Sequence, residues 1–450
     1  MHQGQRSKQI GAARRRAYDI LYRVEVEQAY ASVLLAAIPD SSLSREDRAL
    51  AQEIVLGVLR WQRTLDYFIE RDTGRSIERL DLPVVIALRM GLYQIRHLAR
   101  IPRSAAVNDS VNLAKRARVS SAAGLVNAVL RKAAAHPSEI RADDIADSLE
   151  RASVELSHPA WMLGRWRMML GEEGTRRLAL ANNSPSPTAF RVNLLRASVD
   201  ERLANLKGQD VTTRESEIAA GAFVLESGSG AIVNQAARQG LIYIQDEASQ
   251  LVSILLDPRP GHRVLDLCAA PGSKTSHIAA LADNKATIIA CDLYHHRLAT
   301  VIATCRRLGI SSIDAITLDA TCALPFGERP AFDRVLVDAP CSGTGTLRGN
   351  PEIKSRLLPD DITRLADLQL DILRQAAGTV AFGGRLVYST CSIEREENEE
   401  VIRRFLERSP TFHVIKPKAR ADLITDEGFV RTYPHRHGTD GFFAAVLEKL

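Results

Sequence analysis

Two cysteines, Cys341 and Cys391, stand 50 positions apart, each in a short motif of small and polar residues. The first motif is Asp338-Ala-Pro-Cys-Ser-Gly, the second is Ser389-Thr-Cys-Ser, and a hydrophobic run precedes each of them. The thiolate is the reactive form of cysteine, and a nearby cation such as Lys274 or a helix N-terminus raises its fraction. The two motifs therefore indicate a reaction that needs a thiolate together with a second acid or base.

A third motif, Asp266-Leu-Cys-Ala-Ala-Pro-Gly-Ser-Lys274, joins an apolar run to a helical pattern. Its small residues let a ligand approach the backbone, and ligands of open α/β sheets bind at the carboxyl ends of the strands. It is not a phosphate-binding P-loop, because Ser273 precedes the lysine and Leu267 replaces the first glycine. A nucleoside-type cofactor fits better, with a structural turn as the alternative. The candidate cofactor-binding residues of this loop are Cys268, Ala269, Ala270, Pro271, Gly272, Ser273 and Lys274.

Aspartates close three further predicted strands, at Asp292, Asp319 and Asp338. An acid in the position of Asp292 is suited to accept hydrogen bonds from ribose hydroxyls, and Asp319 is suited to an adenine amino group. A helix N-cap is the alternative for Asp292. Because the three acids end successive strands, we expect them to line one crevice, with Asp338 facing both cofactor and thiols.

The other cysteines (268, 291, 305 and 322) lack such settings and are interpreted as structural. The spacings of the six cysteines fit neither a zinc site nor the disulfide framework of a small secreted domain. Reduced thiols, no bound metal and a cytoplasmic location are the expectation. Lys354, downstream of Cys341, is interpreted as a solvated charge.

Alternating patterns from residue 241 onward predict a parallel sheet with helices on its faces. The predicted strands are 263–268, 287–293, 314–319, 332–338 and 385–391, and the predicted helices are 273–282, 295–308, 360–377 and 395–408. A β-like run at 442–447 completes the sheet. We expect a catalytic domain over 241–450, preceded by a linker and small α+β subdomain over 136–240.

Residues 1–135 are predicted to form an all-helical domain. Ser44 begins a capping-box pattern, and Pro83 stands where a first helical turn tolerates proline. Residues 1–132 hold 22 Lys and Arg against 13 Asp and Glu, whereas the whole chain is only +5. This surplus points to a polyanion such as nucleic acid, with a solvated basic surface as the alternative.

The totals, 450 residues with 45% hydrophobic and 25% charged content, are typical of a soluble protein of two or three domains. No run of 18 apolar residues is present, so a transmembrane helix is not expected. The first eight residues lack the apolar core of a secretory signal.

Together, the three motifs resemble those of the NOL1/NOP2/Sun family of RNA cytosine-C5 methyltransferases, in particular its RsmB/Sun branch. The segments 245–250 (QDEASQ) and 438–443 (GTDGFF) also resemble the family, and the helical segment resembles its NusB-type RNA-binding domain. The resemblance covers nearly the whole chain. It implies a multidomain protein: an all-α NusB-like domain, a small α+β subdomain and a Rossmann-like α/β methyltransferase domain. Ser273 departs from the family pattern, which usually has a glycine there.

The resemblance implies S-adenosylmethionine as cofactor, bound by residues 268–274 and by the three strand-end aspartates. It implies that Cys391 attacks C6 of a cytosine in 16S ribosomal RNA. Asp338 would then bond the ring nitrogen, Cys341 would help remove the C5 proton, and Lys274 would orient the base. The alternatives are a tRNA substrate, a non-catalytic RNA-binding assembly protein, or a DNA cytosine methyltransferase that uses the Pro-Cys thiol. We expect a monomer.

Overall fold

The computed structural model describes residues 10–39, 42–117, 119–136, 139–140, 144–326 and 332–450. Residues 1–9, whose sequence predicts no secretory signal, lie outside this part. The chain forms two compact units, Met1–Pro185 with Leu347–Arg356, and Ser186–Thr346 with Leu357–Leu450. Within the described part, no helix is long and apolar enough to cross a membrane.

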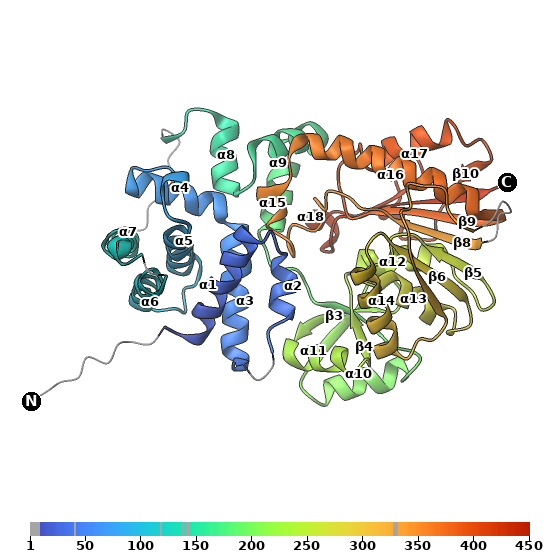
Figure 1. The fold of residues 1–450 in the computed structure, drawn as a ribbon, viewed down its shortest axis with the longest axis horizontal. Helices are drawn as coiled ribbons and strands as arrows, with labels where there is room; N and C mark the ends of the chain where they lie inside the picture. Colours follow the sequence, from blue (N-terminus) through green and yellow to red (C-terminus); the bar gives the residue numbers. More distant parts are fainter. Residues whose placement is uncertain (1–9, 40–41, 118, 137–138, 141–143, 327–331) are drawn as a thin grey trace, which may run out of the picture. The chain divides into compact units, whose positions relative to one another are not determined.

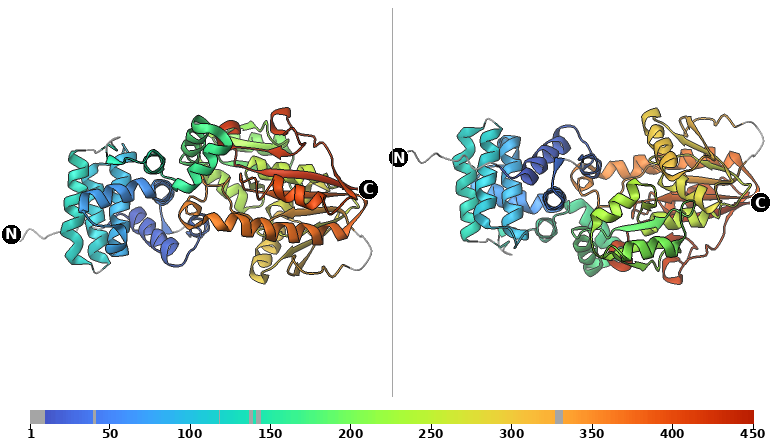
Figure 2. Two further views of the ribbon diagram at one scale, coloured as in Figure 1. Left: turned by 90° about the horizontal axis from the view of Figure 1, so that it is seen from above. Right: turned by 90° about the horizontal axis from the view of Figure 1, so that it is seen from below.

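The first unit is helical, as its sequence pattern predicts (Figure 1). Its helices are α1 Ala12–Val26, α2 Ala31–Ala36, α3 Arg45–Arg60, α4 Gln62–Thr73, α5 Leu82–His97, α6 Arg103–Arg116, α7 Ala123–Ala135, α8 Ser148–Leu156, α9 Ala160–Asn182 and α15 Ile353–Arg356. The Ser44 side chain accepts from the backbone N–H of Asp47, and Pro83 lies in the first turn of α5. α5 is buried over most of its circumference, and its apolar side chains belong to the core of this unit. Figure 2 shows the helices of the unit packed side by side in two views.

Lys354 of α15 is buried within this unit, which shows that its interpretation as a solvated charge is wrong. Its Nζ donates to the carbonyl oxygens of Arg60 at 2.6 Å and Ser157 at 2.8 Å, and to Asn183 Oδ1 at 3.0 Å. Three acceptors satisfy all three donors of the ammonium group. The sequence does not reveal them because they come from three distant segments. Burial, followed by the charge of Arg60, holds the pKa of Lys354 well below its usual value.

The second unit contains a small antiparallel sheet in the order β2-β3-β1-β4. Its strands are β1 Ala189–Val192, β2 Thr212–Glu215, β3 Ala222–Ser227 and β4 Ile242–Ile244, and its helices are α10 Val199–Lys207 and α11 Gly230–Arg238. The apolar face of this sheet packs under the two helices, around Phe190, Phe223 and Val233. This is the α+β subdomain that the sequence predicts.

The same unit contains a larger mixed sheet in the order β10-β12-β9-β8-β5-β6-β7, with β11 paired to β12. The strands are β5 Arg263–Asp266, β6 Thr287–Asp292, β7 Ile313–Thr317, β8 Phe332–Asp338, β9 Val380–Thr390, β10 Phe412–Val414, β11 Val430–Arg431 and β12 Phe443–Lys449. β5 to β9 are parallel, and β12 is antiparallel to β9. The predicted run at 442–447 thus completes the sheet from its antiparallel side.

Helices cover both faces of this sheet, because successive strand residues point to opposite sides (Figure 1). The helices are α12 Glu247–Leu256, α13 Ser273–Leu281, α14 His295–Leu308, α16 Pro359–Thr379, α17 Glu399–Leu406 and α18 Pro434–His437. Val264 and Leu336 pack with α12, α13 and α14, whereas Leu265 and Val335 pack with α16 and α17. Strands buried on both faces read as continuous apolar runs, which explains why they could be predicted.

The strand order reverses between β5 and β8, since the chain leaves β5 toward β6 and β7 and returns to β8 and β9. Ligands of open α/β sheets bind outside the carboxyl ends of the strands at such a switch point. The carboxyl end of β5 is Asp266 and that of β8 is Asp338, and the two strands are direct neighbours. The topology therefore brings the third motif and the Cys341 motif to one place.

Candidate active site

The two thiols lie side by side at the carboxyl ends of β8 and β9. These strands pair in parallel with Asp338 opposite Ser389, so the segments that follow them leave the sheet together. The Sγ atoms of Cys341 and Cys391 are 3.3 Å apart, and both residues are partly exposed. The two thiols meet because β8 and β9 are neighbours in the sheet.

Lys274 and Asp338 form an ion pair beside the thiols. Lys274 Nζ lies 2.7 Å from Asp338 Oδ2, and the Ser389 hydroxyl donates to Asp338 Oδ1 at 2.8 Å. Burial alone would lower the pKa of Lys274, but the charge of Asp338 and its hydrogen bond outweigh burial and raise it, with a smaller contribution from Cys391. The site therefore contains a fixed ammonium group and an oriented carboxylate.

The environment of Cys341 favours the protonated thiol. The hydrogen bond with Cys391 is the main cause that raises its pKa well above the ordinary value, followed by burial and by the charges of Cys391 and Glu397. A thiolate is the nucleophilic form. The protonated thiol of Cys341 is therefore a weaker nucleophile than its thiolate would be.

The loop after β5 leads directly into α13. Thr275 Oγ1 donates to Asp266 Oδ2 at 2.7 Å, whereas the buried Asp266 Oδ1 has no hydrogen-bond partner of good geometry among the described residues, although the Cys268 backbone is near enough to lower the pKa of Asp266. Gly272 has a φ of +95°, a conformation that favours glycine. Ser273, by contrast, is the first residue of α13 and has no positive φ, so this position does not require the usual glycine. Its carbonyl oxygen also accepts from the buried Arg191 of β1 at 3.4 Å.

Asp292 is the last residue of β6, Asp319 lies two residues beyond the end of β7, and the two differ in burial. Asp292 is 3% exposed and accepts from the backbone N–H of Tyr294 at 3.1 Å, with Arg297 at 3.4 Å. It is not the N-cap of α14, which is Tyr294. Asp319 lies exposed beyond the end of β7, where hydrogen bonds from Thr321 lower its pKa.

The loop after Cys341 passes very close to the segment before β12. Gly345 donates its N–H to the Cys391 carbonyl oxygen at 2.9 Å and accepts from the Gly441 N–H at 2.8 Å. A Cβ at position 345 would lie 1.9 Å from the Gly441 oxygen. The side chain at this point must therefore be a hydrogen atom.

Gly345→Ala is expected to lower the free energy of unfolding by about 1–3 kcal/mol and to displace the Cys341 loop. Denaturant unfolding measures the loss, and thiol reactivity measures the displacement. Gly378→Ala in α16 is the control, because a Cβ there meets nothing within 4 Å. It should be neutral or stabilising by about 0.5–1 kcal/mol. Equal stability of the two variants would contradict the close approach.

Asp266 predicts a pH dependence of stability. Burial raises its pKa to about 7 from 3.8, against the hydrogen bond from Thr275. Between these values the folded protein holds a proton that the unfolded chain lacks. The stability from this proton is fully present below about pH 4 and is lost as the pH rises through 7. Relative to Asp266→Asn, the wild-type free energy of unfolding should fall with pH by up to about 1.4 kcal/mol per pH unit. If denaturant titrations give a difference in free energy of unfolding between the wild type and Asp266→Asn that does not change with pH, this prediction is wrong.

Comparison with known proteins places this geometry in a family. Residues 253–448 match the family described as 16S rRNA methyltransferase RsmB/F, 11–135 match the NusB family, and 158–231 match the ferredoxin-like domain of RsmF/B-like methyltransferases. A probable ribosomal RNA small subunit methyltransferase B from Bacillus subtilis is 37% identical over 443 residues, covering 96% of this chain and 98% of the relative. The chain belongs to the RsmB/F methyltransferase family.

Other RsmB/F relatives agree over similar lengths. The ribosomal RNA small subunit methyltransferase B of Pseudomonas putida is 34% identical over 415 residues, covering 91% of this chain and 92% of the relative. The crystal structure of PH0851 superposes with a TM-score of 0.84 at 30% identity, covering 98% of this chain and 99% of that one. The predicted family and fold class are thus confirmed.

The structure also shows what two family-like segments do in this RsmB/F chain. Asp246, from 245–250, accepts from Thr439 Oγ1 at 2.8 Å and from the Asp440 N–H at 3.1 Å, both from 438–443. The sequence marks these segments but does not show that they bind each other. It also gives no signal for Glu397, which is buried between the two cysteine motifs although it stands in a charged run typical of a solvated surface.

Proposed function

We propose that this chain methylates C5 of a cytosine in 16S ribosomal RNA with S-adenosylmethionine as cofactor. The observation that carries the proposal is the pair of thiols, 3.3 Å apart, beside the Lys274–Asp338 ion pair. C5 of cytosine is a poor nucleophile, so its alkylation calls for a covalent partner at C6 and a base for the C5 proton. The two sulfur atoms meet both needs.

The residues at the switch point fit S-adenosylmethionine. The proposed cofactor-binding residues are Cys268, Ala269, Ala270, Pro271, Gly272, Ser273, Lys274, Asp292, Asp319 and Asp338. The Asp292 carboxylate suits ribose hydroxyls, and the next side chains, Leu293 and Tyr294, are 50% and 51% exposed and suit a base. The unpartnered Asp266 Oδ1 suits an ammonium group. When bound, the cofactor supplies an electrophilic methyl group.

Cys391 is the proposed nucleophile. Its sulfur forms a bond to C6 of the cytosine, and the electron pair of the C5–C6 double bond becomes available at C5. Asp338 engages the ring nitrogen of the pyrimidine, with its carboxylate oriented by Lys274 and Ser389. Lys274 also supplies the positive charge of the site.

Cys341 is the proposed acid/base partner. The main cause of its raised pKa is the hydrogen bond with Cys391, and this cause disappears once the Cys391 sulfur is bonded to carbon. Cys341 can then release its thiol proton to solvent and, as a thiolate, accept the proton from methylated C5. The electron pair returns to the C5–C6 bond, the sulfur–C6 bond breaks, and the product is released. Such acid/base help is worth about 10²–10⁴ in rate.

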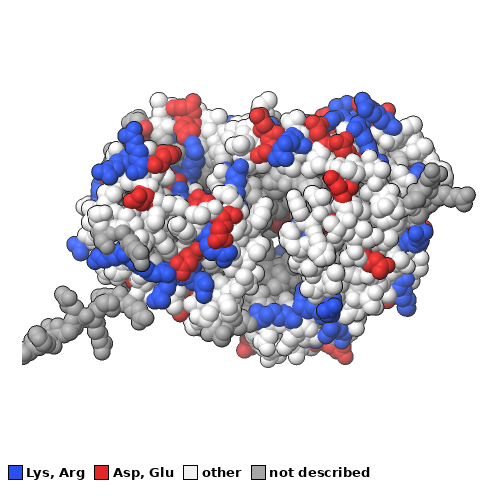
Figure 3. Space-filling view, viewed as in Figure 1, with Lys and Arg blue, Asp and Glu red and all other residues white. Residues whose placement is uncertain are grey.

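The helical residues 1–135 are the proposed RNA-binding domain, 136–240 the linker and RNA-contacting subdomain, and 241–450 the catalytic domain. Figure 3 shows Lys and Arg side chains along the lower edge of the first unit, with acidic side chains between them. The side chains of Arg103, Lys115 and Arg131 are exposed, and they lie within residues 1–132, where Lys and Arg outnumber Asp and Glu. A base inside an RNA stem must leave its stack to reach the thiols, at a cost of a few kcal/mol.

The direct test is transfer of labelled methyl groups from S-adenosylmethionine to RNA from a strain that lacks the enzyme. We expect 5-methylcytosine in 16S ribosomal RNA and none in transfer RNA. Labelled methyl groups in transfer RNA alone would show that transfer RNA, and not 16S ribosomal RNA, is the substrate. Label in neither RNA would favour a non-catalytic assembly protein.

A further inference from the structure

Glu397 precedes α17 and is completely buried. Its Oε1 accepts from the Ser342 backbone N–H at 2.8 Å and from Gln369 Nε2 at 2.9 Å. Its Oε2 accepts from the hydroxyls of Ser342 and Ser392, both at 2.5 Å. Ser342 directly follows Cys341, and Ser392 directly follows Cys391. One carboxylate therefore binds the neighbour of each thiol.

The Cys341 side of this network has a second layer. Gln369 Nε2 also donates to the Pro340 carbonyl oxygen at 2.9 Å, so residues on both sides of Cys341 are held. The Tyr388 hydroxyl contacts Gln369 Oε1 at 2.9 Å and the Glu397 carbonyl oxygen at 2.5 Å. Gln369 and Tyr388 are themselves completely buried, so no water competes with these bonds.

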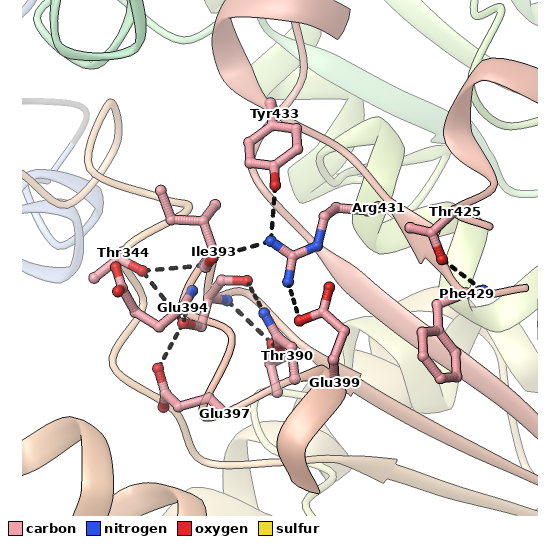
Figure 4. A network of polar contacts seen from close by, with 12 residues as sticks. Thr344, Thr390, Ile393, Glu394, Glu397, Glu399, Thr425, Phe429, Arg431 and Tyr433 are labelled. Atoms are coloured by element: carbon pink, nitrogen blue, oxygen red, sulfur yellow. Dashed lines mark hydrogen bonds and ion pairs between the residues drawn. The ribbon is translucent and has the colours of Figure 1, made fainter. Parts of the chain in front are cut away.

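The Cys391 side is held by the bonds drawn in Figure 4. Thr344 Oγ1 accepts from the Ile393 N–H at 3.1 Å. Arg431 donates to the Ile393 carbonyl oxygen at 3.0 Å and pairs with Glu399 at 2.6 Å. These contacts fix the segment after Cys391. Thr344 and the Gly345 N–H, which donates to the Cys391 carbonyl oxygen, also tie this segment directly to the Cys341 loop. Glu397 adds a link of its own, because it binds the serine that follows each cysteine.

We propose that Glu397 is a positioning residue, whose carboxylate sets the spacing of Cys341 and Cys391 by holding Ser342 and Ser392 together. A carboxylate has acceptor capacity only, and four donors meet it here. Hydrogen bonds to a charged acceptor are about twice as strong as neutral ones and offset part of the cost of burying the charge, although burial still raises the pKa of Glu397. An amide has one acceptor oxygen and cannot accept all four. The effect of Glu397 on the distance between the two sulfur atoms is inferred from its hydrogen bonds. The effect on catalysis rests on the proposed function.

The thiol spacing can be measured without RNA or cofactor. In Cys322→Ala protein, which lacks the exposed cysteine, the aryl disulfide dithionitrobenzoate reacts with one thiol of the pair and releases thionitrobenzoate. The second thiol then loses its proton, attacks the mixed disulfide and releases a second thionitrobenzoate. Glu397→Gln should slow this second release at least about tenfold, because a small displacement of reacting groups has large kinetic effects. Ser392→Ala, a milder change, should slow it less.

Glu247→Gln is the matched control, because Glu247 is also buried and hydrogen-bonded, to Ser216 at 2.5 Å, away from both cysteine loops. It should leave the second release unchanged. In the methylation assay, Glu397→Gln should lower kcat about 10- to 100-fold with an unchanged KM for S-adenosylmethionine. A normal second release in both Glu397→Gln and Ser392→Ala would overturn the proposal. A different pair of results would separate the two proposals. If the Glu397 variant slows the second release but the wild-type protein methylates no RNA, the positioning role is supported and the proposed function is refuted.

Discussion

Replacing Cys391 by alanine is expected to abolish methyl transfer, because no other group in the site can form the bond to C6. Loss of a covalent nucleophile costs on the order of 10³-fold or more in rate. Cys341 remains in this variant and loses its hydrogen bond with Cys391, but burial and the charge of Glu397 still raise its pKa and oppose attack by its sulfur. Tritium transfer to under-modified 16S ribosomal RNA measures the loss.

The experiment needs a control for the loss of a cysteine as such. Cys322→Ala removes an exposed thiol elsewhere in the same unit and should retain wild-type activity. Equilibrium binding of S-adenosylmethionine to Cys391→Ala should also be retained, because the proposed cofactor residues are untouched. Methylation by Cys391→Ala at the wild-type rate would exclude a covalent route through this sulfur.

Much of the catalytic unit could be predicted from the sequence because buried parallel strands are apolar runs that end in polar motifs. The predicted strands 332–338 and 385–391 end at Asp338 and Cys391, and the pairing of Asp338 with Ser389 across β8 and β9 makes the two thiols neighbours. The position of Lys274 beside Asp338 follows from the switch in strand order, which the sequence does not state.

Two sequence-based predictions, the start of the helix over 395–408 and the exposure of Lys354, are wrong because tertiary contacts override the local pattern. The helix predicted over 395–408 begins only at Glu399, because Glu397 and Asn398 turn inward. Asn398 Nδ2 donates to the Ser392 carbonyl oxygen at 2.9 Å. Lys354 was likewise expected in solvent but is buried among three oxygens. A charged residue within a polar stretch of sequence is predicted to be exposed to solvent. Its burial depends on hydrogen-bond partners that lie far away in the sequence.

Cys341→Ala is expected to accumulate a covalent protein–RNA adduct rather than to prevent attack. Cys391 keeps its sulfur and the neighbouring Lys274–Asp338 pair, so the bond to C6 still forms. The base that removes the C5 proton is missing, so release should slow by about 10²–10⁴-fold. A denaturing gel should show a slower-migrating band that carries both protein and RNA and disappears on ribonuclease treatment.

The double variant Cys341→Ala/Cys391→Ala separates this mechanism from nonspecific crosslinking. It should give no slow band, because the band requires the Cys391 sulfur. An adduct from Cys391→Ala together with none from Cys341→Ala would reverse the two roles and make the Pro-Cys thiol the nucleophile. In Cys391→Ala the hydrogen bond that is the main cause of the raised pKa of Cys341 is absent, so only burial and the charge of Glu397 would oppose attack by Cys341. The gel therefore tests the order in which the two thiols act as well as their identities.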